Sequence, residues 1–222
     1  MKKLAGLFIV FLPWKLKRFL LVKFWKYEIH PTARIGFAYV YPRKLKMDKG
    51  SKIAHLTIAI HLDLVELGEN SSIGRSNWIT GFPSSTTSKH FQHQNDRKCE
   101  LLIGRESSIT KKHHIDCTNQ IRIGKFTTVA GYDSQFLSHS INIFENIQDS
   151  FPISIGDYCF VGTNCVILGG AVLPSRSVLG AKSVLNKKYD EEYVLYAGAP
   201  AKKIKAIDHE AKYFHRPTGF VY

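Results

Sequence analysis

The chain has 222 residues, of which 44% are hydrophobic and 22% charged, and its 31 basic and 18 acidic side chains give a formal net charge of +13. This composition is typical of a soluble globular domain with a buried core, and it excludes a disordered, collagen-like or polytopic membrane protein. The cysteines form neither a disulfide framework nor a CxxC zinc pattern, so we expect free thiols in a cytoplasmic protein. They are Cys99, Cys117, Cys159 and Cys165.

Residues 1–29 are predicted to form a basic, apolar N-terminal arm. The first 27 residues hold no acidic side chain and seven basic ones, namely Lys2, Lys3, Lys15, Lys17, Arg18, Lys23 and Lys26. The apolar run 4–12 is shorter than the ~20 residues that a spanning helix needs. Pro13 and the later cations, without a small-residue cleavage site, argue against a signal peptide. Because over half of the net charge lies in this arm, we expect no nucleic-acid partner.

Two interpretations of the arm remain open. A helix from Trp14 to Lys26 combines cations with interfacial aromatic residues, which suits the surface of an anionic membrane. The same segment can instead cap the first coil of the following domain, whose terminal strands otherwise expose unpaired backbone. The cations do not gather on one face of such a helix, so the pattern does not decide between the two.

Aliphatic residues recur every six positions through residues 30–188. This period differs from the ~3.6 residues of an α-helix and from the two residues of a β-strand. The longest run is Ile155, Val161, Ile167, Leu173, Leu179 and Leu185. Glycine follows the aliphatic residue in eight hexads, where a sharp corner needs a permissive backbone. If each hexad is one short strand and one corner, three hexads close a triangular coil, and coils stack at the strand spacing of ~4.7–4.9 Å. The sequence therefore predicts an all-β parallel β-helix with eighteen residues in each coil.

Two loops interrupt the hexads, and we expect both to project from coil corners and to carry function. The first spans residues 82–100. The second spans residues 136–152, because 32 residues separate Ile123 from Ile155, fourteen more than one coil. A two-residue phase shift also separates Ile121 from Ile123. Residues 189–222 are predicted to form a C-terminal capping extension, with an extended stretch over 193–196 and a helix-like tail from residue 208.

The hexads resemble those of a known enzyme family, the left-handed β-helix or hexapeptide-repeat acyltransferases. The resemblance covers about residues 30–207 and is strongest to the maltose, galactoside and exopolysaccharide O-acetyltransferase type. It rests on the segments Ile155–Gly162, Gly180–Val184 and Ala197–Lys202. The resemblance implies a left-handed β-helix, a homotrimer, and acetyl-CoA as cosubstrate in the groove between neighbouring β-helices. It implies no metal.

The resemblance also implies that His139, at the start of the second loop, is the catalytic general base. An imidazole with a pKa near neutrality can take the proton of a sugar hydroxyl as that hydroxyl attacks a thioester. A backbone carbonyl, Glu145 or Asp149 is expected to accept the hydrogen bond of its other ring nitrogen. Asn142 and Glu145 are the expected acceptor-binding residues. We expect structural or acceptor-facing roles for His90, His93, His113 and His114.

The resemblance assigns seven positions to acyl-CoA. Gly162 and Thr163 match the backbone that stabilises the thioester oxyanion, and Ala181 lies along the pantetheine arm. The remaining matches are Asn186 and Lys187 at the end of that arm, and Lys202 and Lys205 near the nucleotide phosphates. Lys182 departs from the family, which usually has glycine there.

From these features we expect an acyl-CoA-dependent O-acetyltransferase that acts on a sugar hydroxyl in surface polysaccharide biosynthesis by direct transfer. The acceptor is expected to be lipid-linked or nucleotide-linked. We expect the protein in the cytoplasm or peripherally on the cytoplasmic face of the membrane. One alternative is an N-acetyltransferase for a nucleotide-linked amino sugar. Another is a metal-dependent, carbonic-anhydrase-like β-helix, which would need three converging histidines such as His90, His93 and His113.

Overall fold

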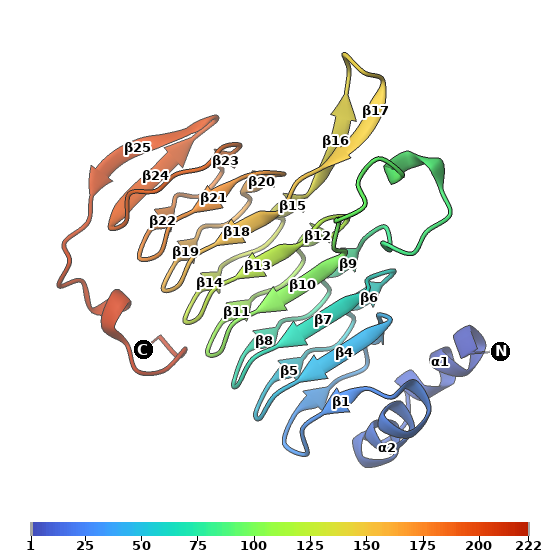
Figure 1. Ribbon diagram of the computed structural model, residues 1–222. Helices are drawn as coiled ribbons and strands as arrows, with labels where there is room; N and C mark the ends of the chain where they lie inside the picture. The colour runs from blue at the N-terminus through green and yellow to red at the C-terminus, as the bar shows by residue number, and fades with distance from the viewer. Residues whose placement is uncertain (1, 222) are drawn as a thin grey trace.

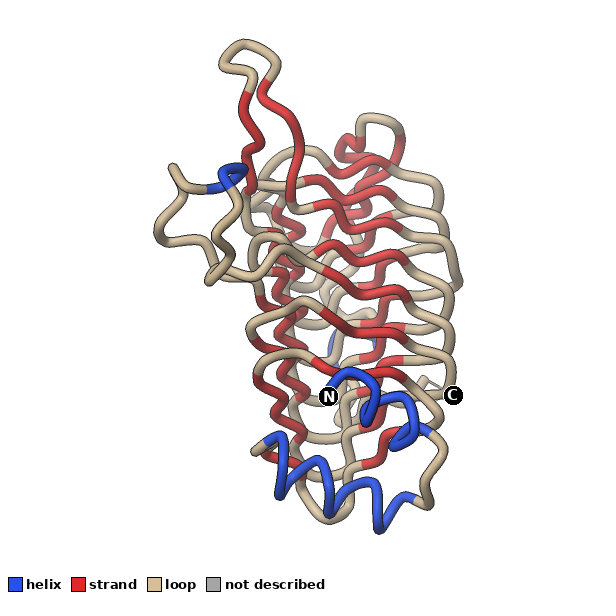
Figure 2. Tube along the Cα trace, turned by 90° about the vertical axis from the view of Figure 1, so that its right-hand side faces the viewer, coloured by secondary structure: helices blue, strands red, loops and turns tan. Residues whose placement is uncertain are grey.

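The computed structural model describes residues 2–221, and the side chains of residues 6–221. Short strands wind into a three-sided rod, with two helices at one end and a pair of longer strands at the other (Figure 1). Seen from the side, the coils lie one above another and their strands form straight walls (Figure 2). The predicted parallel β-helix is confirmed.

Two of the three walls are sheets of parallel strands, apart from the antiparallel pair that ends the second sheet. The first sheet consists of β1 (Glu28–Ile29), β4 (Lys44–Met47), β7 (Leu64–Leu67), β10 (Glu100–Ile103), β13 (Ile121–Ile123), β18 (Ile153–Ile155) and β21 (Val172–Leu173). The second sheet consists of β2 (Arg34–Ile35), β5 (Lys52–Ile53), β8 (Ser72–Ile73), β11 (Ser108–Ile109), β14 (Thr128–Val129), β19 (Phe160–Val161), β22 (Val178–Leu179), β24 (Val194–Gly198) and β25 (Ala201–Ala206).

The third wall is the sheet on which the candidate site lies. It consists of β3 (Tyr39–Tyr41), β6 (Ile58–Ile60), β9 (Trp78–Thr80), β12 (His114–Asp116), β15 (Gln135–Leu137), β20 (Val166–Leu168) and β23 (Val184–Leu185). Side chains alternate across the strands of the three walls, so the apolar residues of the core point into the rod and their neighbours point outward.

The aliphatic residues of successive coils stack in register and form a continuous core. Ile155 pairs with Leu173, an eighteen-residue step as predicted. Ile103 pairs with Ile123, a step of 20 residues, so the uniform eighteen-residue coil is wrong for this part of the chain. The two extra residues lie between the inward-facing Ile115 and Ile123, which are eight residues apart instead of six. This longer side of the coil is the origin of the phase shift.

Two insertions leave the rod at the ends of third-sheet strands. Residues 81–99 separate β9 from β10 and contain the 3-10 helix η1 (Lys89–Phe91). After β15, the antiparallel hairpin of β16 (His139–Asn142) and β17 (Ile147–Ser150) projects far from the rod (Figures 1 and 2). The first sheet continues across the hairpin, because β13 still pairs with β18.

The N-terminal arm is a cap on the first coil, formed by α1 (Lys2–Val10) and α2 (Trp14–Trp25). Leu21 is buried against the core, and the Lys17 ammonium donates to the carbonyl of Gly36 at 2.7 Å. The Arg18 guanidinium donates to the carbonyl of Ile29 at 2.6 Å. These bonds satisfy backbone groups that the first coil would otherwise expose, so the cap interpretation describes how the arm packs. Within residues 2–221, no helix has the length and apolar character to cross a bilayer.

The C-terminal extension departs from the prediction of a helical tail. Strands β24 and β25 prolong the second sheet, but the only helix after residue 208 among the described residues is a 3-10 turn, η2 (Lys212–His215). The tail runs back along the coil corners, where the Tyr213 hydroxyl donates to Cys159 O at 2.9 Å and Arg216 donates to Phe126 O. An α-helix rises only ~1.5 Å per residue, so an extended tail reaches successive coils more readily.

Candidate active site

The site centres on a histidine and a carboxylate from neighbouring coils. Asp116 is the last residue of β12, and it pairs in register with Leu137 at the end of β15. The chain turns through Ser138, whose hydroxyl donates to Asp116 O at 2.7 Å, and His139 then begins the hairpin. His139 Nδ1 consequently lies 2.5 Å from Asp116 Oδ2.

The two side chains differ in exposure, and this difference suits a catalytic base. The Asp116 side chain is 7% exposed, and the His139 side chain is 40% exposed. Burial raises the pKa of Asp116, but hydrogen bonds from His139 and Thr118 outweigh burial and lower it overall. The hydrogen bond to Asp116 raises the pKa of His139, against the opposing effects of burial and of the Arg97 charge. The proton of neutral His139 therefore belongs on Nδ1, which leaves Nε2 as the free base.

Thr118 fixes the orientation of the carboxylate. Its backbone N–H donates to Asp116 Oδ1 at 3.1 Å, and its hydroxyl donates to the same oxygen at 2.7 Å. Oδ1 is thus occupied by Thr118, and Oδ2 is the oxygen that meets His139. The geometry matches the His–Asp pairing of acyl-transfer enzymes in which the acid holds one imidazole tautomer.

The partner of His139 is none of the three alternatives expected from the sequence. Asp149 instead pairs with His93, Oδ1 to Nε2 at 2.9 Å, and accepts from Asn142 Nδ2 at 3.1 Å. Asn142 Oδ1 accepts the backbone N–H of Glu145 at 3.3 Å, so Asn142 stabilises the hairpin turn. Glu145 is exposed near the tip of the hairpin, beyond the end of β16. The structure does not bring the side chains of Asn142 and Glu145 to His139.

The insertion 81–99 forms a second wall beside His139. The ring of Phe91 is buried and lies edge-on to the His139 ring, with centroids 6.1 Å apart. Arg97 stacks on Phe91 at 4.7 Å and donates to the carbonyls of Thr118 and Pro83. This buried guanidinium therefore ties the insertion to the strand end that carries Asp116.

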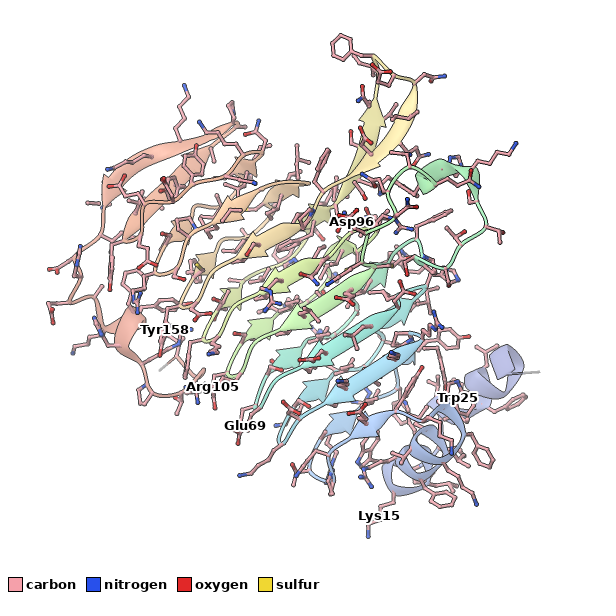
Figure 3. All side chains as sticks on the ribbon, in the orientation of Figure 1. Lys15, Trp25, Glu69, Asp96, Arg105 and Tyr158 are labelled. Atoms are coloured by element: carbon pink, nitrogen blue, oxygen red, sulfur yellow. The ribbon has the colours of Figure 1, made fainter. Side chains whose placement is uncertain are left out.

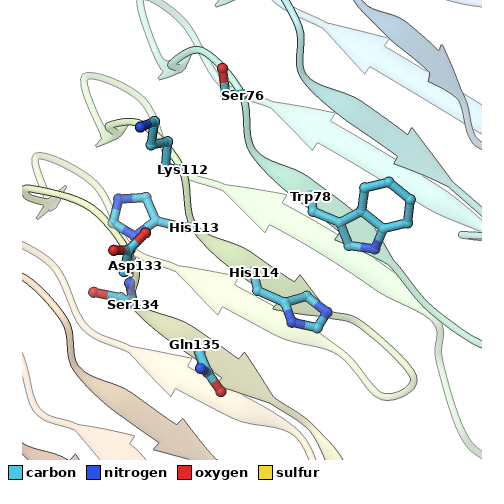
Figure 4. Close-up of a pocket in the computed structure, with 8 residues that line it drawn as sticks. All are labelled: Ser76, Trp78, Lys112, His113, His114, Asp133, Ser134 and Gln135. Atoms are coloured by element: carbon cyan, nitrogen blue, oxygen red, sulfur yellow. Dashed lines mark hydrogen bonds between the residues drawn. The ribbon is translucent and has the colours of Figure 1, made fainter.

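A groove of about 500 Å³ lies on the outer face of the third sheet (Figure 4). Trp78, His114 and Gln135 face outward from adjacent strands and line it, and they occupy matching register positions. Trp78 is 48% exposed, which is unusual for a residue of that size. Asp116 lies two residues beyond His114 on β12, so the groove lies about 7 Å along the strand from the His139–Asp116 pair.

The other predicted histidines have structural positions. His113 is buried, accepts the N–H of Ser134 on Nδ1 at 3.1 Å and bonds Thr110 through Nε2 at 3.0 Å. Burial lowers the pKa of His113 to about 4. His90 packs edge-on against Phe82. Within residues 2–221, no three His, Cys, Asp or Glu side chains gather where they could hold a metal ion.

The residues assigned to acyl-CoA fall into two rows at opposite ends of the third-sheet strands. Gly162 and Thr163 lie before β20, and Ala181 stacks on Gly162, whose position leaves no room for a Cβ. Asn186 and Lys187 follow β23, at the same end of the sheet as His139. One chain therefore does not bring its own His139 to its Gly162 row.

The first row continues into the C-terminal strands. Lys202 and Lys205 are exposed on β25, whereas Lys203 between them pairs with Glu191 at 2.5 Å. Gly162 N–H donates to Leu179 O at 2.8 Å within the sheet, so the Thr163 N–H is the better candidate as an oxyanion donor. Lys182 has a φ of 57°, a conformation that favours the glycine expected there from the resemblance.

Sequence reasoning missed Asp116, Thr118 and Arg97. A signal for Asp116 was available, because it directly follows the inward-facing Ile115 on a strand that the hexads predict. Its role as partner of His139 depends on the register between β12 and β15, a step of 21 residues that the eighteen-residue coil did not give.

Comparisons with known proteins agree with the fold and the hexads. No family model matches the chain. The chain is 31% identical over 116 residues to WbbJ of Escherichia coli, described as a lipopolysaccharide biosynthesis O-acetyl transferase, which covers 52% of this chain and 55% of that protein. It is 35% identical over 66 residues to the galactoside O-acetyltransferase of Escherichia coli, 30% of this chain and 32% of that protein. The chain thus spans about half or less of these relatives.

Two solved structures share the fold. A hexapeptide-repeat acetyltransferase from Vibrio cholerae in complex with acetyl coenzyme A has a TM-score of 0.51 and 23% identity, covering 64% of this chain and 70% of that one. The polysialic acid O-acetyltransferase OatWY has a TM-score of 0.51 and 19% identity, covering 84% and 90%. The chain is therefore similar to the hexapeptide-repeat O-acetyltransferases in sequence and has their left-handed β-helical fold, which confirms the resemblance seen in the hexads.

Proposed function

We propose that the protein is an acetyl-CoA-dependent O-acetyltransferase that modifies a sugar hydroxyl during surface polysaccharide biosynthesis. The observation that carries the proposal is the His139–Asp116 pair, 2.5 Å apart and about 7 Å along the strand from an open groove. The relatives named for O-acetylation, and the fold shared with an acetyl coenzyme A complex, support this reaction over others on the same fold.

In the proposed reaction, His139 Nε2 takes the proton of the sugar hydroxyl as its oxygen attacks the thioester carbonyl carbon of acetyl-CoA. Asp116 stabilises the imidazolium that forms, and the Thr163 N–H of a neighbouring protomer stabilises the oxyanion. The carbon–sulfur bond then breaks, and the imidazolium returns its proton to the departing thiolate. The products are an O-acetyl sugar and free coenzyme A, and no covalent enzyme intermediate forms.

We propose a homotrimer in which the two rows meet between protomers. The separation of His139 from Gly162 within one chain supports this arrangement, because a complete site then needs two copies. The hairpin tip supports it as well, since Ile143 is 78% exposed and Phe144 is 91% exposed. A neighbouring protomer would cover these side chains. A fully active monomer in light scattering would contradict the shared site.

The groove on the third sheet is the proposed position of the acceptor sugar. The exposed Trp78 offers an aromatic face for a sugar ring, and His114 and Gln135 offer hydrogen-bonding groups beside it. Trp78→Ala should raise the KM for the acceptor more than the KM for acetyl-CoA. The acceptor is proposed to be a lipid-linked precursor. Four buried free thiols suit a reducing compartment, and we propose that the enzyme works in the cytoplasm.

The test is release of coenzyme A thiol from acetyl-CoA across a panel of sugar acceptors that includes amino sugars. Transfer to hydroxyl acceptors is expected, and transfer only to amines would favour the N-acetyltransferase alternative. His139→Ala should abolish transfer and leave acetyl-CoA affinity within a few-fold, because the base acts in the transition state. A His139→Ala protein that keeps most of its turnover would refute the assignment.

A further inference from the structure

We propose that the N-terminal cap docks on an anionic phospholipid surface through its solvent-facing side. This outer face is defined by five exposed side chains of α2 and by the residue that follows the helix, namely Lys15, Leu16, Phe19, Val22 and Lys23, with Lys26 at the C-cap. Lys15, Phe19 and Val22 follow each other at four- and three-residue intervals, so they form one stripe of the helix. The inference does not depend on the proposed enzymatic activity.

The outer face is apolar where a cap in water should be polar. Leu16 is 47% exposed and Phe19 is 53% exposed, and α1 adds Phe8 at 74%. Phe11, in the turn between the helices, is also 74% exposed. End caps of repeat proteins need a polar outer side to stay in solution. Single exposed apolar residues are ordinary, but a concentration of them in one cap marks an interaction surface.

The opposite end of the rod provides an internal comparison. There β25 closes the second sheet with three exposed lysines, at 202, 203 and 205, and a single large exposed aliphatic residue, Ile204. Both ends face the same problem of covering the last coil. Only the N-terminal end presents a surface rich in Phe and Leu, so coverage of the coil alone does not explain its composition.

The charges of the outer face select an anionic partner. Lys15, Lys23 and Lys26 lie among the apolar side chains, and the Lys23 ammonium lies 5.3 Å from the Phe19 ring centroid. Figure 3 shows Lys15 extending away from the rod. Residues 1–27 contain no acidic side chain that would repel a phosphate. Aromatic and aliphatic residues with cations around them are the composition of interfacial helices on anionic bilayers.

Two cations of α2 lie away from the outer face and hold the helix on the first coil. Lys17 and Arg18 point inward and bond to carbonyls of the first coil, as described above. The other two cations of α2, Lys15 and Lys23, are exposed on the outer side. The same bonds fix α2 to the rod, so the outer face is presented without the cost of folding a free peptide.

Docking through this face leaves the candidate site free. The cap and the hairpin that carries His139 lie toward opposite ends of the molecule in both views (Figures 1 and 2). A bilayer under the cap therefore does not cover the groove of the third sheet.

The experiment is co-sedimentation of the full-length protein with vesicles of phosphatidylcholine alone or phosphatidylcholine mixed with phosphatidylglycerol. We expect binding to the mixed vesicles that weakens with added salt, and much weaker binding to neutral vesicles. Leu16→Ser/Phe19→Ser should abolish binding to both. Lys15→Gln/Lys23→Gln/Lys26→Gln should weaken binding to the anionic vesicles about 100-fold, since each of the three cations near such a surface contributes about fivefold.

The matched control replaces three exposed lysines outside the cap, Lys44, Lys52 and Lys111, by glutamine. This control should bind as the wild type does, although it loses the same net charge. Circular dichroism establishes that each variant is folded, so a loss of binding reports on the surface. Equal binding by the wild type and both cap variants, or an equal loss in the control, would overturn the proposal. Light scattering that shows larger assemblies for the wild type than for Leu16→Ser/Phe19→Ser would instead assign the face to a second copy of the chain.

Discussion

Replacement of Asp116 by asparagine should damage the enzyme more than its replacement by alanine. Thr118 donates two hydrogen bonds to Oδ1, at 2.7 and 3.1 Å, so the oxygen of an asparagine side chain must take that position. The amide nitrogen then occupies the place of Oδ2 and donates to His139 Nδ1. The imidazole proton is forced onto Nε2, and the atom that should accept the sugar proton is blocked.

The size of the effect follows from the contacts. In Asp116→Ala, His139 loses a charge-assisted hydrogen bond of about 1.5–3 kcal/mol, which corresponds to about a 10-fold to 150-fold loss in kcat. In Asp116→Asn, the wrong tautomer adds to this loss, and the expected decrease is about 10⁴-fold, as for other histidine bases whose aspartate is replaced by asparagine. Acetyl-CoA affinity should change little in either variant.

The assay is kcat and kcat/KM for thiol release over a range of pH. The hydrogen bond to Asp116 raises the pKa of His139, so the acid limb of the wild-type pH–rate profile should lie at a higher pH than for an ordinary histidine. Asp116→Ala removes the cause of that increase and should move the limb to lower pH. Thr118→Val in the asparagine background removes one of the two donors that hold the amide oxygen in place, the hydroxyl, and should restore part of the activity. Asp116→Asn with activity equal to or greater than that of Asp116→Ala would refute the assignment of Asp116.

Three further outcomes follow from buried or exposed cations. Arg97→Met should move the acid limb to higher pH, opposite to Asp116→Ala, because the Arg97 charge lowers the pKa of His139; an unchanged pH–rate profile would contradict this. Burial lowers the pKa of Lys17 to about 8, so native stability should rise with pH between about 8 and 10.5 by up to about 3 kcal/mol. Urea unfolding at several pH values should show that Lys17→Met lacks this increase. Lys202→Ala and Lys205→Ala should each raise the KM for acetyl-CoA with little change in kcat, and unchanged KM values would remove them from the cosubstrate site.

The sequence predicts the fold well because the hexad pattern reports burial directly. An aliphatic residue at every sixth position must face the same interior if strands are short and corners are sharp, and Val161 and Leu179 stack as this rule requires. The rule does not predict which residues stack where one side of a coil contains extra residues. Ile121 and Ile123 are both buried, and the pattern alone leaves open which of them begins the next coil.

The candidate site is less predictable because its parts come from different coils. His139 stands out by its place at the start of an insertion, but its partner is distant in sequence and meets it only through strand register. Glu145 and Asp149 are close to His139 along the chain. In the hairpin, however, Glu145 lies near the tip, and Asp149 pairs with His93. The C-terminal tail was mispredicted for a related reason, since its bonds to coil corners override local helical preference.

The uninterrupted pairing of the first sheet across the hairpin has an evolutionary consequence. Ile123 meets Ile155 in the next coil, although an entire hairpin lies between them in sequence. The packing of the core therefore does not depend on the length or composition of the hairpin that projects from the coil corner. Natural selection can lengthen, shorten or replace this insertion without repacking the interior. Proteins with the same rod can therefore exchange such segments, and a graft of residues 138–152 into another chain would bring His139 with it but would depend on that chain's own rod for a carboxylate at the position of Asp116.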